Sequence, residues 1–169
     1  MAEEQVPSNG QPGGAAAQAT GPQLVVQRIY MKDSSFESPS APEVFSGEWD
    51  PRMDLNIGAS SRSLGDDHYE VTLSVTVEAK KEDKVAFLCE VHQAGVFLIR
   101  GFSEEDSRRV LNASCPNVIF PYAREAVCDL VTRGGFPQLL LQPVNFDSLY
   151  QRHTAEMQQQ QTGASGQPS

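Results

Sequence analysis

The sequence lacks the segments that would carry a protein into or across a membrane. No stretch approaches the roughly 18 consecutive apolar residues of a membrane-spanning helix. The first 22 residues contain Glu3 and Glu4 in place of a basic start, and they have no apolar core, so they do not match a secretory signal. We therefore expect a cytoplasmic protein without membrane insertion.

Cysteine is scarce and irregularly spaced. The three cysteines, Cys89, Cys115 and Cys128, are an odd number, which argues against a disulfide framework and fits a reducing compartment. Their spacing is not that of a metal site, so we predict no metal and no cofactor. Cys89 and Cys128 fall on apolar faces of predicted elements, which indicates buried side chains.

Basic residues are in short supply. The chain has 13 Lys and Arg against 22 Asp and Glu, a formal net charge of −9. Such a surface repels phosphate backbones and anionic lipid, which makes nucleic acid and membranes poor partners. It favours a basic partner instead.

The sequence also lacks the short motifs of enzymes. It contains no Gly-rich phosphate loop, no G-x-S-x-G and no H-E-x-x-H. His68, His92 and His153 are far apart, and a surface position in water explains each of them. We predict that the protein is not an enzyme, since an unrecognised hydrolase would need a nucleophile and a base that the sequence does not show.

Composition divides the chain into three parts. Residues 1–22 consist largely of Gly, Ala, Gln, Pro and Ser, and we predict a disordered leader because they cannot bury enough apolar surface to offset chain entropy. Residues 154–169, with a run of four glutamines, are predicted to be a disordered tail for the same reason. The folded domain is expected over residues 23–153.

Apolar residues alternate along the first half of this domain, which predicts strands. The clearest run is His68–Lys80, and shorter runs cover Leu24–Lys32, Met53–Ala59 and Val85–Val91. Polar turns at Gly65–Asp67 and Lys81–Lys84 separate three of these runs: Met53–Ala59, His68–Lys80 and Val85–Val91. Because short connections join antiparallel neighbours, we expect a four-stranded antiparallel meander.

Helix signals dominate the second half. Ser103 followed by Asp106 resembles a capping box and predicts a short helix, which we expect Cys115-Pro116-Asn117 to interrupt. A second helix should begin near Pro121 and end at Gly134-Gly135, and Asn145 can cap a third. Strands followed by helices predict an α+β fold with the helices packed on one face of the sheet.

Two segments point to binding. Leu88 shares a strand face with Glu90, and Glu70 and Glu78 on the neighbouring strand could complete an acidic cluster; this is either a solvated sheet face or a docking patch. The long segment 33–52 contains Phe36, Val44, Phe45 and Trp49, the single tryptophan. It either caps the core or forms one wall of an apolar groove.

Several blocks of residues, in order, resemble the SecB family of bacterial protein-export chaperones. They cover nearly all of residues 23–153: Gln27–Asp33, Phe36–Pro39, Ala41-Pro42, Val44-Phe45, Trp49, Tyr69–Val71, Ala86–Val91, Cys115–Asn117, Phe120–Glu125, Phe136–Leu139 and Pro143–Asp147. The resemblance implies a four-stranded antiparallel sheet with helices, assembled as a homotetramer made of two dimers. It also implies binding of unfolded precursor proteins and their delivery to the SecA motor ATPase.

The resemblance implies two sites. The family's docking site for SecA corresponds here to Asp33, Glu37, Leu88 and Glu90. It receives a small, basic, zinc-bearing C-terminal segment of SecA, and the zinc belongs to that partner. The apolar groove for unfolded clients matches Val44, Phe45, Trp49, Met53, Phe146, Leu149 and Tyr150, of which the last three are extrapolated from a common helix stripe. Met31 and His92 depart from the family pattern of Thr and Gln. His92 lies on the predicted docking face, where its protonation would weaken attraction to a basic partner.

A different class of function is also compatible with the pattern. A small-molecule binding protein would hold a defined ligand in a closed apolar pocket between sheet and helices. A chaperone would instead bind many denatured proteins and none of the same proteins when folded.

Overall fold

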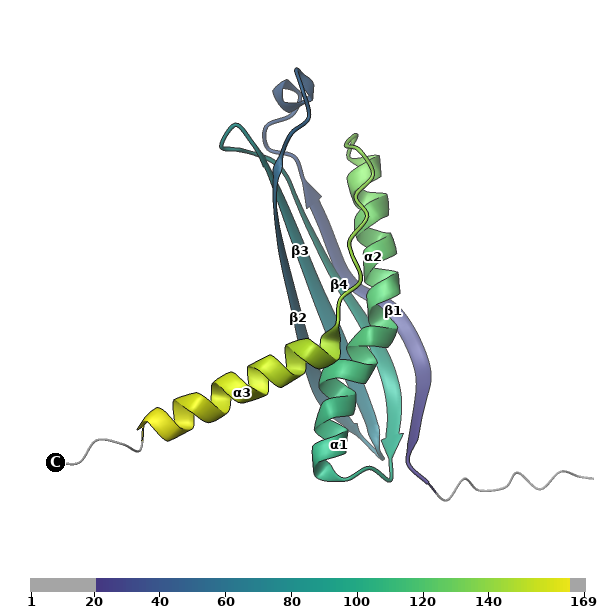
Figure 1. Cartoon of the computed structure of the whole chain (residues 1–169). Coiled ribbons are helices and arrows are strands. Elements are labelled where there is room, and N and C mark those ends of the chain that lie inside the picture. The colour runs from purple at the N-terminus through teal and green to yellow at the C-terminus, as the bar shows by residue number, and fades with distance from the viewer. Residues whose placement is uncertain (1–20, 165–169) are drawn as a thin grey trace, which may run out of the picture.

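The computed structural model describes residues 21–164, with side chains as far as residue 159. Its four strands, β1 (Gln23–Glu37), β2 (Arg52–Gly65), β3 (His68–Lys81) and β4 (Lys84–Arg100), form one antiparallel sheet. A single helical turn, η1 (Glu43–Phe45), lies between β1 and β2. The predicted four-stranded antiparallel sheet with helices is confirmed (Figure 1).

The predicted meander is wrong for the first strand. The sheet order is β1-β4-β3-β2, so β1 pairs with β4 at one edge while β2 forms the other edge. We predicted neighbouring strands from short connections, and among the four strands such connections join only β2 to β3 and β3 to β4. Residues 38–51 join β1 to β2 and are long enough to carry the chain to the far edge, which gives a Greek-key arrangement.

Tight turns connect the three consecutive strands. Asp66 and Asp67 join β2 to β3, and Glu82 and Asp83 join β3 to β4, all with positive φ between 49° and 62°. Positive φ at both central residues defines the type I′ turn, whose twist matches that of the flanking strands. Both polar turns were predicted, and they fix the register of the three-stranded unit.

The strands extend beyond their predicted ends. β1 continues through the segment 33–37, which we had assigned to the long loop, and β4 runs to Arg100 instead of Val91. Register shifts near Gln27 and Lys32 break the alternation in β1. In β4, the central residues Gln93, Ala94 and Gly95 are all buried, so the inner strand has no polar phase there.

The helical half of the chain begins with one continuous stretch. α1 (Glu104–Arg109) passes through a wider turn, η2 (Val110–Ser114), into α2 (Cys115–Arg133). The Asp106 N–H donates to Ser103 Oγ at 3.1 Å, which confirms the predicted cap. The predicted break at Cys115–Asn117 is wrong: the helical stretch continues across it, with the wider turn η2 directly before Cys115 and Pro116, and Pro121 lies within the same helix.

The last helix is longer than predicted. α3 (Phe146–Ala164) begins with the Ser148 N–H donating to Asn145 Oδ1 at 3.0 Å, as expected. It continues through residues 154–164, which we assigned to a disordered tail; glutamine is a good helix former and the segment contains no proline. The predicted leader 1–22 lies, apart from its last two residues, outside the described residues, as do residues 165–169.

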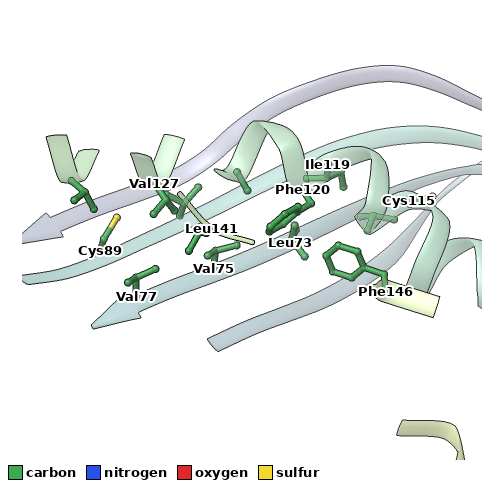
Figure 2. Packing of buried hydrophobic residues seen from close by; sticks show 14 of the residues in the cluster. Leu73, Val75, Val77, Cys89, Cys115, Ile119, Phe120, Val127, Leu141 and Phe146 are labelled. Atoms are coloured by element: carbon green, nitrogen blue, oxygen red, sulfur yellow. The ribbon is translucent and has the colours of Figure 1, made fainter. Parts of the chain in front are cut away.

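Among the helices of residues 21–164, α2 alone lies along the sheet, whereas α3 projects away from it after its first turns (Figure 1). α2 packs over β3 and β4, and the core fills the space between them (Figure 2). Cys89 and Cys115 are fully buried there, so burial raises the pKa of their thiols to about 11 and about 12. Within residues 21–164, no helix is both long and apolar enough to span a membrane.

Candidate functional site

Five aromatic rings from distant parts of the chain meet at one end of the sheet. This aromatic cluster is centred on Phe136, which follows α2. The Phe136 ring centroid lies 5.0 Å from that of Phe87, 5.1 Å from Phe45 and 5.2 Å from Trp49. Phe36 of β1 stacks on Phe87 at 5.6 Å. The segment 38–51 therefore covers part of the core here, as one of our two interpretations of it required.

Exposure rises steeply across the aromatic cluster. Phe87 and Phe136 are buried, whereas Phe45 keeps 51 % of its surface in water. Val44 is buried beneath it, and Trp49 is half-buried. A shallow pocket of about 140 Å³ opens between Phe45, Trp49 and Pro137. The same segment therefore both caps the core and presents an apolar wall to solvent.

The loop that carries Phe45 is fixed to its neighbours. Lys81 Nζ, at the end of β3, donates to the carbonyl of Val44 at 3.3 Å and to that of Ser46. Ser38 Oγ donates to the carbonyl of Ala86 at 2.8 Å. The lysine satisfies two loop carbonyls that have no partner in regular secondary structure, and it fixes the backbone on both sides of Phe45.

An uncovered apolar row continues along β2. Met53, Leu55 and Ile57 pair with the buried residues Ala79, Val77 and Val75 of β3, so the three side chains lie on the face that α2 covers elsewhere. α2 packs on β3 and β4, leaving Met53 38 % and Leu55 48 % exposed.

The row ends against the start of α3. Ile57 lines a pocket of about 360 Å³ together with Phe146, Leu149 and Tyr150. Phe146 is buried and packs edge-to-face on Phe120, with ring centroids 5.7 Å apart. An ion pair between Arg109 and Asp147, at 2.8 Å, holds the first turn of α3 on the preceding helical stretch.

We name the whole surface the apolar groove: it begins at Phe45 and Trp49, follows Met53, Leu55 and Ile57, and ends at Leu149 and Tyr150. All seven predicted groove residues lie on or under it, but Val44 and Phe146 are buried in its floor. Leu55 and Ile57 were missed although they share the phase of Met53. Phe136 was missed because no local pattern marks it.

The opposite sheet face carries the four predicted docking residues. In the register of β1 and β4, Glu37 lies opposite Leu88, and Ser35 lies opposite Glu90. Asp33 lies opposite His92, so all of these side chains share the face away from α2. Asp33 and Glu37 are exposed, and Leu88 and Glu90 are half-buried. We name this surface the acidic face.

His92 is bonded on both sides within the acidic face. Its Nε2 lies 2.6 Å from Glu90 Oε1, and its Nδ1 lies 2.8 Å from Ser74 Oγ on β3. The sequence predicted a solvated histidine. The side chain keeps only 30 % of its surface exposed.

Glu70 does not join this acidic face. It lies opposite Val96, far along β4 from Glu90, and is only 4 % exposed. The carboxylate accepts hydrogen bonds from Arg62 of β2, from Tyr30 of β1 and, at 3.0 and 3.1 Å, from Lys32 of β1. The predicted cluster of Glu70, Glu78 and Glu90 is therefore wrong, because side chains from both edge strands neutralise its first member.

These hydrogen bonds change the titration of Glu70. The Arg62 guanidinium, and after it the Tyr30 hydroxyl, lowers the pKa of the Glu70 carboxyl from 4.5 to about 2, and burial opposes the change. The same bond raises the pKa of Tyr30. Across residues 21–159, no group of three or more His, Cys, Asp or Glu side chains is placed to hold a metal ion.

Comparison with protein families decides what kind of chain carries these two surfaces. Residues 17–158 match the family model described as preprotein translocase subunit SecB. The chain belongs to the SecB family.

Relatives named protein-export protein SecB support the assignment. The chain is 48 % identical over 169 residues to the SecB of Alkalilimnicola ehrlichii, covering 99 % of this chain and 89 % of that one. It is 52 % identical over 145 residues to the SecB of Psychrobacter arcticus, covering 86 % and 95 %. The resemblance inferred from the sequence blocks is confirmed.

A solved structure supports the SecB fold. A Mycobacterium tuberculosis SecB-like chaperone, solved in complex with a ChAD peptide from the HigA1 antitoxin, superposes with a TM-score of 0.59. It is 18 % identical, and the match covers 72 % of this chain and 87 % of that one.

Proposed function

We propose that this SecB-family protein binds unfolded precursor proteins in its apolar groove, keeps them competent for translocation and delivers them to the SecA motor. One observation carries the proposal in the structure: a row of apolar side chains, fixed by the core beneath it, stays open to water from Phe45 to Leu149. An unfolded chain offers the complementary surface, since its own apolar side chains are exposed.

The groove suits binding without sequence selectivity. Burial of apolar surface contributes about 25 cal/mol per Å² and has no directional requirement. Many different segments can therefore be held by the same residues, and a folded protein offers few such segments. The protein acts in this scheme by binding and release, with no reaction of its own and no cofactor.

The alternative of a small-molecule binding protein is less favoured. It required a closed apolar pocket between the sheet and the helices, but the pockets formed by the groove residues are lined by exposed side chains such as Phe45 and Leu149. Membership of a family of export chaperones also supports a polypeptide as the ligand.

We assign docking of SecA to the acidic face. Leu88 lies between Glu37 of β1 and Glu78 of β3, with Glu90 two residues along β4, so an apolar contact is flanked by carboxylates; Asp33 lies further along the same face, opposite His92. That chemistry fits a basic, zinc-bearing segment of SecA, whose zinc stays with the partner. Because the acidic face and the apolar groove lie on opposite sides of the sheet, both can be occupied at once.

We further propose a cytoplasmic homotetramer, built as a dimer of dimers. Apolar side chains outside the groove support an assembly: Val25, Val26 and Met31 on edge strand β1 are 44–48 % exposed, and Tyr122 on α2 is 49 % exposed. Several grooves on one assembly raise the affinity for a long client through effective concentration.

The groove assignment predicts the behaviour of a precursor diluted from urea. The protein should slow aggregation of the unfolded precursor and should not bind the same protein once folded. Leu55→Ser and Phe45→Ser should each weaken client affinity, by about three- to tenfold, because each removes an exposed apolar contact. Light scattering and titration with a labelled precursor measure both effects.

Met157→Ser provides the matched control. Met157 is 50 % exposed on the outer part of α3, away from the groove, so its substitution removes similar apolar surface. Equal loss in all three variants would show that general surface hydrophobicity binds clients. Unchanged affinity in Leu55→Ser and Phe45→Ser would refute the groove.

A further inference from the structure

His92 occupies a position in the acidic face from which it can alter the charge of a docking residue. We propose that His92 makes docking on this face dependent on pH, so that a basic partner binds less tightly once the imidazole is protonated. The inference rests on the docking role proposed above and adds a regulation of that same site.

The hydrogen bonds around the ring define its neutral form. Glu90, as a carboxylate, can only accept, so Nε2 must carry the hydrogen in the 2.6 Å contact with Glu90 Oε1. Nδ1 is then an acceptor, and the Ser74 hydroxyl donates to it across 2.8 Å. The neutral ring is therefore held from both sides.

The same positions also suit the protonated ring. When Nδ1 gains a hydrogen it becomes a donor, and Ser74 Oγ can accept because a hydroxyl has lone pairs and rotates freely. Neither β3 nor β4 has to move. His92 and Glu90 together then change from a net charge of −1 to 0 while every hydrogen bond is kept.

The groups facing His92 decide what that change does. On β4 the neighbour is Glu90, on β1 the opposite residue is Asp33, and on β3 it is Ser74. Lys32, beside Asp33, is directed to Glu70 at 3.0 Å. Two carboxylates therefore border the ring, and a positive imidazole between them reduces the attraction of this patch for a cationic partner.

Histidine is the side chain whose ordinary change of charge falls in the physiological pH range, so the test compares pH 8 with pH 5.5. Charge pairs that are open to solvent interact weakly, so the effect on affinity is modest. Between pH 8 and pH 5.5 we therefore expect wild-type affinity to fall by about two- to fivefold more than that of His92→Gln. Glutamine keeps a neutral amide near Glu90 and cannot be protonated.

The experiment uses the full-length protein and a zinc-loaded synthetic peptide of the basic C-terminal segment of SecA. Isothermal titration at pH 8 and pH 5.5 gives the dissociation constants for wild type, His92→Gln and, as the control, His68→Gln. His68 is the first residue of β3, at the opposite end of that strand from the acidic face, and its ring is bonded to the carbonyl of Asp66. The titration of the peptide itself cancels, because all variants meet the same peptide.

We expect His92→Gln to lose the extra pH dependence and His68→Gln to keep it. If His92→Gln retains the wild-type pH dependence, the inference is overturned. Glu90→Gln at pH 8 tests the docking site separately: unchanged binding there would refute docking itself, whereas weakened binding with an unaltered His92→Gln profile would refute only the role of His92.

A measurement on the wild type covers the case in which His92→Gln does not fold. If protonation of His92 weakens binding, then bound peptide must shift the titration midpoint of its imidazole to lower pH, because the two equilibria are linked. NMR titration of the His92 ring with and without peptide follows this shift. A midpoint that stays in place, or moves to higher pH, would overturn the inference.

Discussion

Glu70 shows how a single side chain can hold together elements that are far apart in the sequence. Its carboxylate lies on β3 and accepts hydrogen bonds from Arg62 on β2 and from Tyr30 and Lys32 on β1. β1 and β2 are the two edges of the sheet, so the contacts extend across all four strands. The strand pattern predicted the face of Glu70 but not its partners, because the order of the strands was not predicted.

The lowered pKa of Glu70 predicts a specific loss of stability in acid. The free carboxyl has an ordinary value of 4.5 and the folded one a value of about 2, so the stabilisation is complete above pH 4.5 and is lost as the pH falls toward 2. Glu70→Gln should lower the free energy of unfolding at pH 7 by about 1–3 kcal/mol and flatten its decrease between pH 4.5 and pH 2.

Urea unfolding at a fixed protein concentration, at pH 7, 4.5, 3 and 2.5, measures both effects. Glu78→Gln is the matched control, since Glu78 pairs with Lys80 at 2.6 Å on the same strand face and is more exposed. A wild-type profile and a Glu70→Gln profile that run parallel below pH 4.5 would contradict the assignment.

Individual elements were predicted best where a local signal is strong. The two type I′ turns, the Ser103 cap and the end of α2 at Gly134-Gly135 each depend on a few adjacent residues. The ends of β1 and β4 were missed because register shifts and burial on both faces remove the alternation. Among site residues, those on strands were placed correctly by phase, but the contacts of Phe136 depend on tertiary packing alone.

The join between α2 and the aromatic cluster predicts one sensitive glycine. A Cβ on Gly134 would lie 2.2 Å from Cζ of Phe36, whose ring stacks on Phe87. Gly134→Ala should therefore destabilise the fold by about 1–3 kcal/mol through overpacking. Thermal and urea unfolding test this, with Gly58→Ala as the control, because nothing lies within 4 Å of a Cβ at Gly58. Equal stability of the two variants would argue against close packing at Gly134.

The turn between β3 and β4 offers a stabilising change. Glu82 has a φ of +49°, a conformation that asparagine adopts more readily than glutamate. Glu82→Asn should raise the free energy of unfolding by about 0.5–1 kcal/mol. The control is Glu48→Asn, the same change at an exposed loop residue. A gain of the same size in both variants would indicate relief of excess negative charge instead.

At the scale of the whole molecule, the two proposed binding surfaces lie on opposite faces of the sheet. Apolar side chains collect on the side of α2 and carboxylates on the other, as expected from the alternation of strand residues. Fold class, family and the sheet face of each predicted strand residue were therefore accessible from sequence. The edge position of β1 was not accessible, because the sequence does not show which strand β1 pairs with. The length of α3 was not accessible either, because the composition of residues 154–164 suggested disorder.

The separation of faces predicts how docking depends on charge and salt. Glu37→Lys should weaken binding of the basic SecA peptide by about three- to tenfold at low ionic strength, and the difference should shrink at 0.5 M salt. Glu105→Lys on α1 changes the net charge equally but lies outside the acidic face. Equal losses in both variants would mean that net charge alone attracts the peptide. Neither substitution should change the affinity for unfolded clients, because both residues lie outside the apolar groove.

The floor of the apolar groove is also the interior of the protein: Val44, Phe136 and Phe146 support the exposed side chains and pack into the core at the same time. These three residues cannot close over a bound polypeptide without leaving the core. A client in the proposed groove would therefore be held by surface contact, and its segments would detach one at a time when a stronger binder takes them up.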